Sequence, residues 1–189
     1  QVTIGDTTHK LKSPFVVLAT QNPIEQEGTY NLPEAQLDRF MMRVNIDYPD
    51  FASEKEVLGL KTNPLLQLNK MITAADLAEL QVAVNNIHTD EKIKDIIIKI
   101  VHATRPGNSY FNKKFTPYIS TGASPRAAIW LYKLSKFKAF LKGRDFVNPE
   151  DIMDIVPDVL CHRVVMSYEA NLEKINTISL MREIAASQL

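Results

Sequence analysis

The residues that could do chemistry in this chain are one asparagine and two arginines, Asn22, Arg39 and Arg126. Arg126 gives the clearest physical signal, because the sequence SPRAA places it in the first turn of a predicted helix. The helix dipole is positive there and disfavours a cation by roughly 0.3 to 1 kcal/mol, so we expect an anion nearby. From the sequence alone, a carboxylate is the favoured partner.

Asn22 follows a short apolar run at residues 15–19, FVVLA, which is rich in β-branched side chains. This pattern predicts a strand buried on both faces of a parallel sheet. Ligands of open α/β sheets gather beyond the carboxyl ends of the strands, so Asn22 is a candidate site residue. Asn22 also precedes Pro23, and because Asn-Pro commonly starts a turn, a purely structural role stays open.

Arg39 lies on a predicted short helix that starts near Pro33. Asn31 can cap this helix, Pro33 suits its first turn and Glu34 can bond back to the cap. Taken alone, Arg39 is a helix-surface residue that pairs with Glu34 or Asp38.

Composition limits the class of protein. The 189 residues are 45% hydrophobic and 23% charged, enough for one good core or two small ones. Lys+Arg and Asp+Glu number 22 each, so no net charge attracts nucleic acid or an acidic membrane. A single cysteine, Cys161, argues against disulfides and fits a reducing, cytoplasmic location. No run approaches the ~18 apolar residues that span a bilayer.

We predict no metal site. The four histidines show no metal-ligand spacing with one another or with Cys161. Glu25, Glu27 and Glu34 could serve acid/base chemistry, but solvation at the surface explains them better.

The first 50 residues have the pattern of an α/β domain. Residues 1–11 alternate apolar and polar side chains around a turn at residues 5–8, which predicts a hairpin. Residues 43–48, RVNIDY, alternate again and predict the last strand of the sheet, which Pro49 and Asp50 end. We therefore place a domain boundary here, with residues 1–50 as α/β core and 51–189 as a helical lid.

The pattern after this boundary is helical. We predict helices at residues 53–61, after a Thr73 capping box, after Thr89 or Asp90 up to about Thr104, from Ser124, and after Asn148 with a bend at Pro157. Residues 108–121 are predicted to be an irregular loop, whose aromatic side chains more often fix a loop to the core than stack on nucleic acid. The tail from Ser167 is amphipathic but unassigned.

The helix from Ser124 carries a predicted buried stripe and a predicted solvated face. The stripe consists of Trp130, Leu134, Phe137 and Leu141, and the solvated face of Lys133, Lys136, Lys138 and Lys142. Acidic residues follow these lysines closely, which favours solvation over contact with nucleic acid.

Six segments, taken in order, resemble the MoxR-type AAA+ ATPases. They are ATQNP, EQEGTY, LPEAQLDRF, TGASPRAA, GRDFVNPEDI and VLCHR, and they span nearly the whole chain except its last two dozen or so residues. The resemblance implies that Asn22 is sensor 1, Arg39 the arginine finger and Arg126 sensor 2, with the γ-phosphate of ATP as the partner of Arg126. It also implies that the first hairpin is the one before the sensor 1 strand, which some AAA+ branches project toward the central pore, although a plain edge hairpin explains the same residues equally well.

The sequence contains neither G-x-x-x-x-G-K-S/T nor an apolar strand ending in an acidic pair. We therefore expect it to be the C-terminal portion of a longer ATPase, whose N-terminal segment is needed to bind ATP and magnesium. The resemblance implies a remodelling chaperone assembled as a homo-oligomeric ring, a hexamer, with a client or adaptor protein as partner. The alternatives are a non-catalytic helical adaptor and a DNA-directed AAA+ relative; zero net charge counts against the second.

Overall fold

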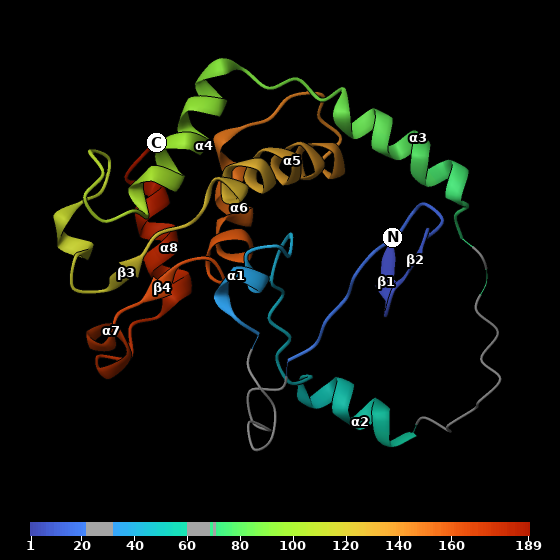
Figure 1. Ribbon diagram of the computed structural model, residues 1–189, viewed down its shortest axis with the longest axis horizontal. Coiled ribbons are helices and arrows are strands. Elements are labelled where there is room, and N and C mark those ends of the chain that lie inside the picture. Colours follow the sequence, from blue (N-terminus) through green and yellow to red (C-terminus); the bar gives the residue numbers. More distant parts are fainter. Residues whose placement is uncertain (22–31, 60–68, 70) are drawn as a thin grey trace.

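The computed structural model describes residues 1–21, 32–59, 69 and 71–189. Helices dominate these residues (Figure 1). They are α1 Glu34–Leu37, α2 Phe51–Gly59, α3 Ala74–Asn85, α4 Glu91–Ala103, α5 Pro125–Leu141, α6 Pro149–Leu160, α7 Tyr168–Leu172 and α8 Thr177–Ala186, with a 3-10 turn η1 at Lys113–Phe115. The strands are β1 Val2–Ile4, β2 Thr7–His9, β3 Ile119–Thr121 and β4 Val165–Met166.

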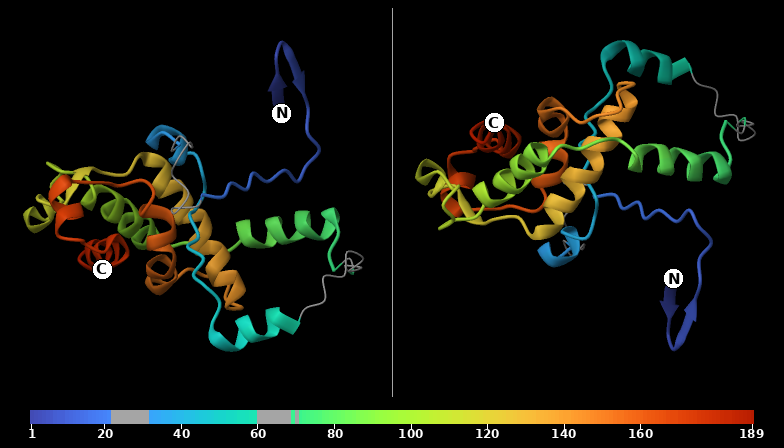
Figure 2. Two further views of the ribbon diagram at one scale, coloured as in Figure 1. Left: turned by 90° about the horizontal axis from the view of Figure 1, so that it is seen from below. Right: turned by 90° about the horizontal axis from the view of Figure 1, so that it is seen from above.

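The predicted N-terminal hairpin is confirmed. β1 pairs antiparallel with β2, with Val2 opposite His9 and Ile4 opposite Thr7. Gly5 sits in the turn at φ 58°, a backbone conformation that side chains with a Cβ rarely adopt. Figure 2 shows the hairpin standing away from the helical body, and all of its residues are exposed.

The two strands predicted beyond the hairpin are absent. Residues 15–19 and 43–48 form no strand, and Leu18 is 90% exposed. A β-strand needs a neighbouring strand to hydrogen-bond, and the part of the chain that the structure describes offers none beside either segment. The apolar run at residues 15–19 and the alternation at residues 43–48 therefore predicted the wrong local structure.

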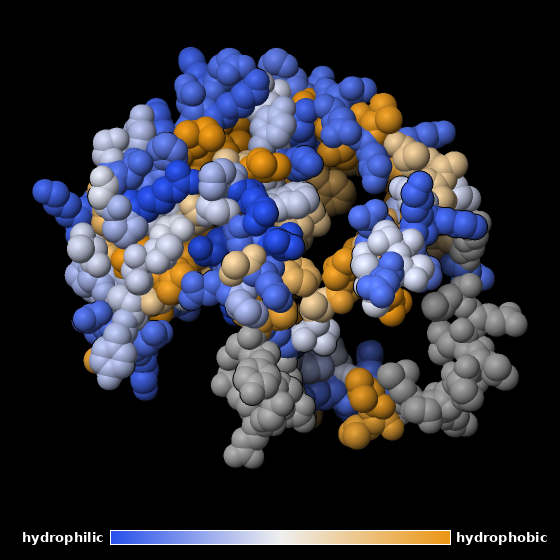
Figure 3. Space-filling view, in the orientation of Figure 1, coloured by the Kyte–Doolittle hydropathy of each residue, from blue (hydrophilic) through white to orange (hydrophobic). Residues whose placement is uncertain are grey.

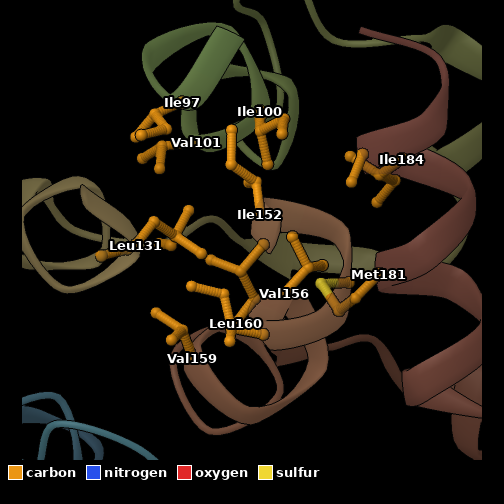
Figure 4. Close-up of a cluster of buried hydrophobic side chains, with 14 of the residues drawn as sticks. Ile97, Ile100, Val101, Leu131, Ile152, Val156, Val159, Leu160, Met181 and Ile184 are labelled. Carbon is orange, nitrogen blue, oxygen red and sulfur yellow. The ribbon is translucent and has the colours of Figure 1, made fainter. Parts of the chain in front are cut away.

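Four helices, α4, α5, α6 and α8, build the hydrophobic core (Figure 4). The helices predicted after Thr89 or Asp90 and after Asn148 are confirmed as α4 and α6, and their residues Ile97, Ile100, Ile152 and Val156 are almost fully buried. The predicted caps Thr73 and Asp90 accept backbone N–H groups at the starts of α3 and α4. α6 continues through Pro157 to Leu160.

The C-terminal tail, unassigned from its pattern, completes this core. α8 packs on α6 and α4 through Leu180, Met181 and Ile184, all of which are buried. β3 and β4, also not foreseen, pair antiparallel and join the loop before α5 to the segment after α6.

The predicted buried stripe of α5 is partly wrong. Leu134 is buried, but Phe137 and Leu141 are 45% and 63% exposed. The buried positions are instead Ala127, Leu131, Leu134, Ser135, Lys136 and Ala139. α5 packs against both α4 and α6, and small side chains such as alanine allow helices to approach closely, whereas large apolar residues at the edge of the stripe stay outside.

Lys136 also departs from the predicted solvated face. Its side chain is buried, and its ammonium group donates a hydrogen bond of 2.6 Å to the carbonyl of Asn85, the last residue of α3. A cation is stabilised at a helix C-terminus, where the last carbonyl groups lack partners within the helix. Lys136 therefore fixes the end of α3 on α5.

The turn between α5 and α6 is organised around a buried carboxylate, Asp151. Its oxygens lie 2.5 Å from Arg144 Nη2 and 3.1 Å from Lys142 Nζ, and accept the backbone N–H of Asn148 at 2.9 Å. Burial acts to raise the pKa of Asp151, but these hydrogen bonds and the charge of Arg144 outweigh it, so the pKa lies below its usual value. Three residues of the segment GRDFVNPED, namely Arg144, Asn148 and Asp151, thus have a structural role in this turn.

We predict that Asp151→Asn lowers the free energy of unfolding by about 1 to 3 kcal/mol at pH 7, the usual value of a hydrogen bond to a charged group. Asp154→Asn removes a half-exposed partner of Lys142 and should cost less than about 1 kcal/mol. Urea denaturation followed by circular dichroism measures both.

The difference in the free energy of unfolding between wild type and Asp151→Asn should also depend on pH. Because the folded pKa of Asp151 is lowered, its contribution is present above the unfolded pKa of about 3.9 and is lost as the pH falls below it. Equal destabilisation by Asp151→Asn and Asp154→Asn at pH 7 would contradict the structural role of Asp151.

Candidate functional site

Of the predicted site residues, Asn22 lies outside the described residues, as do Glu25, Glu27 and Asn31. Arg39 and Arg126 are both described. They come from segments that are far apart in the sequence, the turn after α1 and the start of α5, and the structure brings these two segments together.

Arg39 does not lie on the helix that was predicted to carry it. α1 ends at Leu37, and Arg39 occupies the following turn, where its backbone N–H donates to the carbonyl of Gln36 at 3.1 Å. Its side chain is exposed, and within the described segments it pairs with neither Glu34 nor Asp38. An exposed guanidinium on a short turn is available to a group outside this chain.

Arg126 is in the first turn of α5, as predicted. The hydroxyl of Ser124 caps this helix by accepting the N–H of Arg126 at 3.2 Å. Arg126 Nη1 donates to Asp38 Oδ2 at 2.9 Å, and the Arg126 side chain remains 51% exposed. The carboxylate that the helix dipole led us to expect is therefore Asp38.

Asp38 is the meeting point of three groups. Besides Arg126, it accepts a hydrogen bond of 2.7 Å from Ser124 Oγ, and its Oδ1 lies 3.3 Å from Arg163 Nε. Burial acts to raise the pKa of Asp38, but the hydrogen bonds from Ser124 and Arg126 and the charge of Arg163 outweigh it and lower the pKa. Asp38 is thus a carboxylate that stays ionised at neutral pH.

Arg163 is the residue of this cluster to which the sequence gave no role. Its side chain is completely buried. Its guanidinium donates to the carbonyls of Val159 at 2.5 Å, Asp38 at 3.2 Å and Met41 at 3.3 Å, and also to that of Phe40. It therefore holds the turn on both sides of Arg39.

A signal for Arg163 was present in the sequence. Arg163 lies four residues after Val159, so it continues the apolar face of α6, where a charge is unexpected. A charged residue on a buried face is almost always paired, so a carboxylate partner could have been predicted, but not that the partner would be Asp38.

A cavity of about 280 Å³ opens beside this cluster, lined by residues that include Glu34, Arg43, Cys161, His162 and Arg163. Burial raises the pKa of the Cys161 thiol to about 11, which makes it a poor nucleophile. Arg126 is not among the residues that line this cavity.

His162 packs against the same turn. Its Nε2 lies 3.4 Å from the carbonyl of Phe40. Burial lowers the pKa of His162 to about 4, and the neighbouring charge of Arg163 acts in the same direction. The imidazole is therefore neutral at physiological pH.

Among the described residues, no three His, Cys, Asp or Glu side chains are grouped so that they could hold a metal ion. None of the helices in the described ranges combines the length and the hydropathy that crossing a membrane requires.

Comparison with known proteins identifies the class to which this arrangement belongs. Residues 1–42 match the family model of the ATPases associated with various cellular activities (AAA), and residues 114–184 match that of the AAA lid domain. The turn that carries Arg39 lies in the first match, and the helix that carries Arg126 lies in the second.

Individual relatives narrow the class. The uncharacterized protein YeaC of Bacillus subtilis is 41% identical over 98% of this chain and 56% of its own length. Chaperone MoxR1 of Mycobacterium tuberculosis is 37% identical over 93% of this chain and 46% of its own length. A crystal structure from Cytophaga hutchinsonii, described as a candidate ATPase, superposes with a TM-score of 0.88 at 44% identity, over 98% of this chain and 57% of that one.

The chain belongs to the MoxR-type AAA+ ATPases, as its motifs indicated. Its fold class, the C-terminal part of an AAA+ α/β domain followed by a helical lid, agrees with both family matches and with the superposition. The chain spans about half the length of the relatives it matches.

The buried His162 predicts a pH dependence of stability. Its folded pKa of about 4 lies below the unfolded value of about 6.5, so protonation favours the unfolded state. The contribution of His162 to the free energy of unfolding should be fully present above pH 6.5. As the pH falls toward 4, the free energy of unfolding should decrease by at most about 1.4 kcal/mol per pH unit. Chemical denaturation of the protein at pH 7.5, 6 and 5 measures this loss.

His162→Gln removes the titrating ring and should flatten this dependence. The control is His9→Gln, which changes an exposed histidine of β2 and should retain the wild-type dependence. An identical loss of stability between pH 7.5 and 5 in wild type and His162→Gln would show that His162 does not cause it.

Proposed function

We propose that this chain is the ATP-sensing and lid portion of an ATPase that couples hydrolysis to protein remodelling as a homo-oligomeric, hexameric ring. One observation carries this proposal. Two arginines lie beside Asp38: Arg39, which follows it in the chain and is exposed, and Arg126, which pairs with it and is half exposed. The relationship to chaperone MoxR1 supports the remodelling role.

Arg126 fits a phosphate group. Its guanidinium contacts Asp38 through a single nitrogen, is half exposed and stands at the N-terminal end of a 17-residue helix, where anions are favoured. Among the described residues, no three His, Cys, Asp or Glu side chains are grouped to hold a metal ion, and we assign the magnesium ion to residues outside this set. Bound Mg-ATP supplies the phosphoanhydride bond that is cleaved.

Arg39 fits the role of an arginine finger. A finger must be a permanently charged, planar donor at the edge of one subunit, so that it reaches the nucleotide of the next. Arg39 is exposed, while its backbone is fixed through the carbonyls of Asp38, Phe40 and Met41. We assign Asn22 the role of orienting the attacking water, which an uncharged amide does without neutralising the phosphate.

The first prediction for this function concerns Arg39. In the full-length protein, Arg39→Ala should retain ATP binding and lower turnover by about three to five orders of magnitude, the usual contribution of an arginine finger. Lys92→Ala, which removes an exposed cation from α4, should leave turnover unchanged. Steady-state ATPase assays with nucleotide titration measure both.

Mixing experiments test whether Arg39 acts across an interface. Full-length subunits with Arg39→Ala should regain activity when mixed with subunits in which the lysine of the G-x-x-x-x-G-K-S/T motif is replaced. A head-to-tail ring can then pair an intact finger of one subunit with an intact nucleotide site of the next. Mixed rings that assemble but show no activity at any ratio would indicate a structural role for Arg39.

The second prediction concerns Arg126. Arg126→Ala should reduce the preference for ATP over ADP by about tenfold to a hundredfold, the equivalent of a charge-assisted hydrogen bond of roughly 1.5 to 3 kcal/mol. Stability should change by less than about 1 kcal/mol, because loss of a half-exposed ion pair and relief of an unfavourable dipole interaction oppose each other.

Lys138→Ala is the matched control, because Lys138 is another cation of α5 with an exposed carboxylate partner, Asp154. It should leave the ATP/ADP preference unchanged. If Arg126→Ala lowers the melting temperature markedly and leaves this preference intact, Arg126 is only the ion-pair partner of Asp38.

A further inference from the structure

The three partners of Asp38 differ in how firmly they are held. Arg163 is completely buried, Asp38 is 15% exposed, and Arg126 is 51% exposed. A half-exposed ion pair contributes little to stability, whereas a buried cation that loses its counter-charge destabilises the fold strongly. The contact to Arg126 therefore costs less to break than the contact to Arg163.

The two contacts use different oxygens of the carboxylate. Arg126 binds Oδ2, whereas Ser124 and Arg163 lie against Oδ1. Departure of Arg126 thus leaves the Oδ1 contacts in place. Asp38 also precedes Arg39 directly in the chain, so whatever fixes Asp38 fixes the backbone that carries Arg39.

We propose that Asp38 is a positioning residue for both arginines. Through Oδ2 it retains Arg126 until a γ-phosphate takes that guanidinium, and through Oδ1 it keeps the Arg39 turn docked on Ser124 and Arg163. The inference rests on the proposed function, because it presupposes that Arg126 contacts the γ-phosphate. It adds a competition between a carboxylate of the chain and a phosphate of the ligand for one guanidinium.

Competition between Asp38 and the γ-phosphate for Arg126 predicts a difference between ATP and ADP binding, which a purely structural role of Asp38 does not predict. In wild type, binding of ATP must break the Asp38–Arg126 pair, whereas ADP has no γ-phosphate and leaves it intact. Asp38→Asn removes the charge at nearly constant size, so ATP should bind about two- to fivefold more tightly, as expected for loss of a half-exposed ion pair, while ADP affinity stays the same. Turnover should nevertheless fall by about tenfold to a hundredfold, because the turn that carries Arg39 loses the side-chain ion pair with Arg163 and is held less precisely.

The experiment is titration of the full-length protein with ATP and ADP, alongside turnover and thermal melts. Asp154→Asn is the matched control, since it removes a carboxylate that pairs with Lys138 and Lys142 in the lid, and it should alter none of these values except the melting temperature. In an Arg126→Ala background, Asp38→Asn should no longer change ATP affinity, because the competing guanidinium is absent.

Asp38→Asn also leaves Arg163 without its counter-charge, so a second variant is needed if it melts below the assay temperature. Asp38→Glu keeps the charge and displaces it by one methylene group. It should bind ADP normally and lose turnover by at least about tenfold. Unchanged turnover in Asp38→Glu would overturn the positioning role.

The outcomes separate the inference from the function on which it rests. If Arg126→Ala leaves the ATP/ADP preference intact, the proposed sensing function fails. If Arg126→Ala reduces the preference but Asp38→Asn changes ATP and ADP affinities equally, or changes neither, only the positioning role of Asp38 is overturned.

Discussion

The site depends on one buried charge, the guanidinium of Arg163. Removing a cation from water costs several kcal/mol even after the protein relaxes, so the group must be given counter-charges and acceptors. Arg163 finds its acceptors in the carbonyls of Asp38, Phe40, Met41 and Val159 and its counter-charge in the Asp38 carboxylate. The need to solvate this cation is what draws the turn after α1 onto the end of α6.

The rest of the site follows from that docking. Once Asp38 lies against Arg163, its second oxygen faces the N-terminus of α5, where Ser124 caps the helix and Arg126 needs an anion. Three sequence segments, which carry Asp38, Ser124 with Arg126, and Arg163, are therefore connected through one carboxylate. The four-helix core of α4, α5, α6 and α8 holds the second and third segments in place, and the turn is added from outside.

What could be predicted from the sequence was mostly local. Capping residues such as Thr73 and Asp90, and helices such as α4 and α6, depend on neighbours a few residues away and were predicted correctly. Features set by distant partners were not: the strand predicted at residues 15–19 lacks a neighbouring strand among the described residues, and the α5 stripe was displaced because close packing against α4 and α6 selects small residues. For the site, helix electrostatics predicted that Arg126 would have a carboxylate partner, but could not select Asp38, which is 88 residues away.

The two arginines that pair with Asp38 differ in exposure, and they are therefore held with different firmness. If both arginines that pair with Asp38 were buried, both would be held firmly. If both were exposed, neither would be, because water and salt would screen the two ion pairs. Asp38 instead stands between a fully buried and a half-exposed arginine, so its two oxygens experience different surroundings. A single carboxylate can then fix the backbone beside Arg39 while leaving Arg126 able to exchange partners. This combination requires a short aspartate side chain inside the turn after α1, and the anchoring carboxylate and the exposed arginine are adjacent there, at positions 38 and 39.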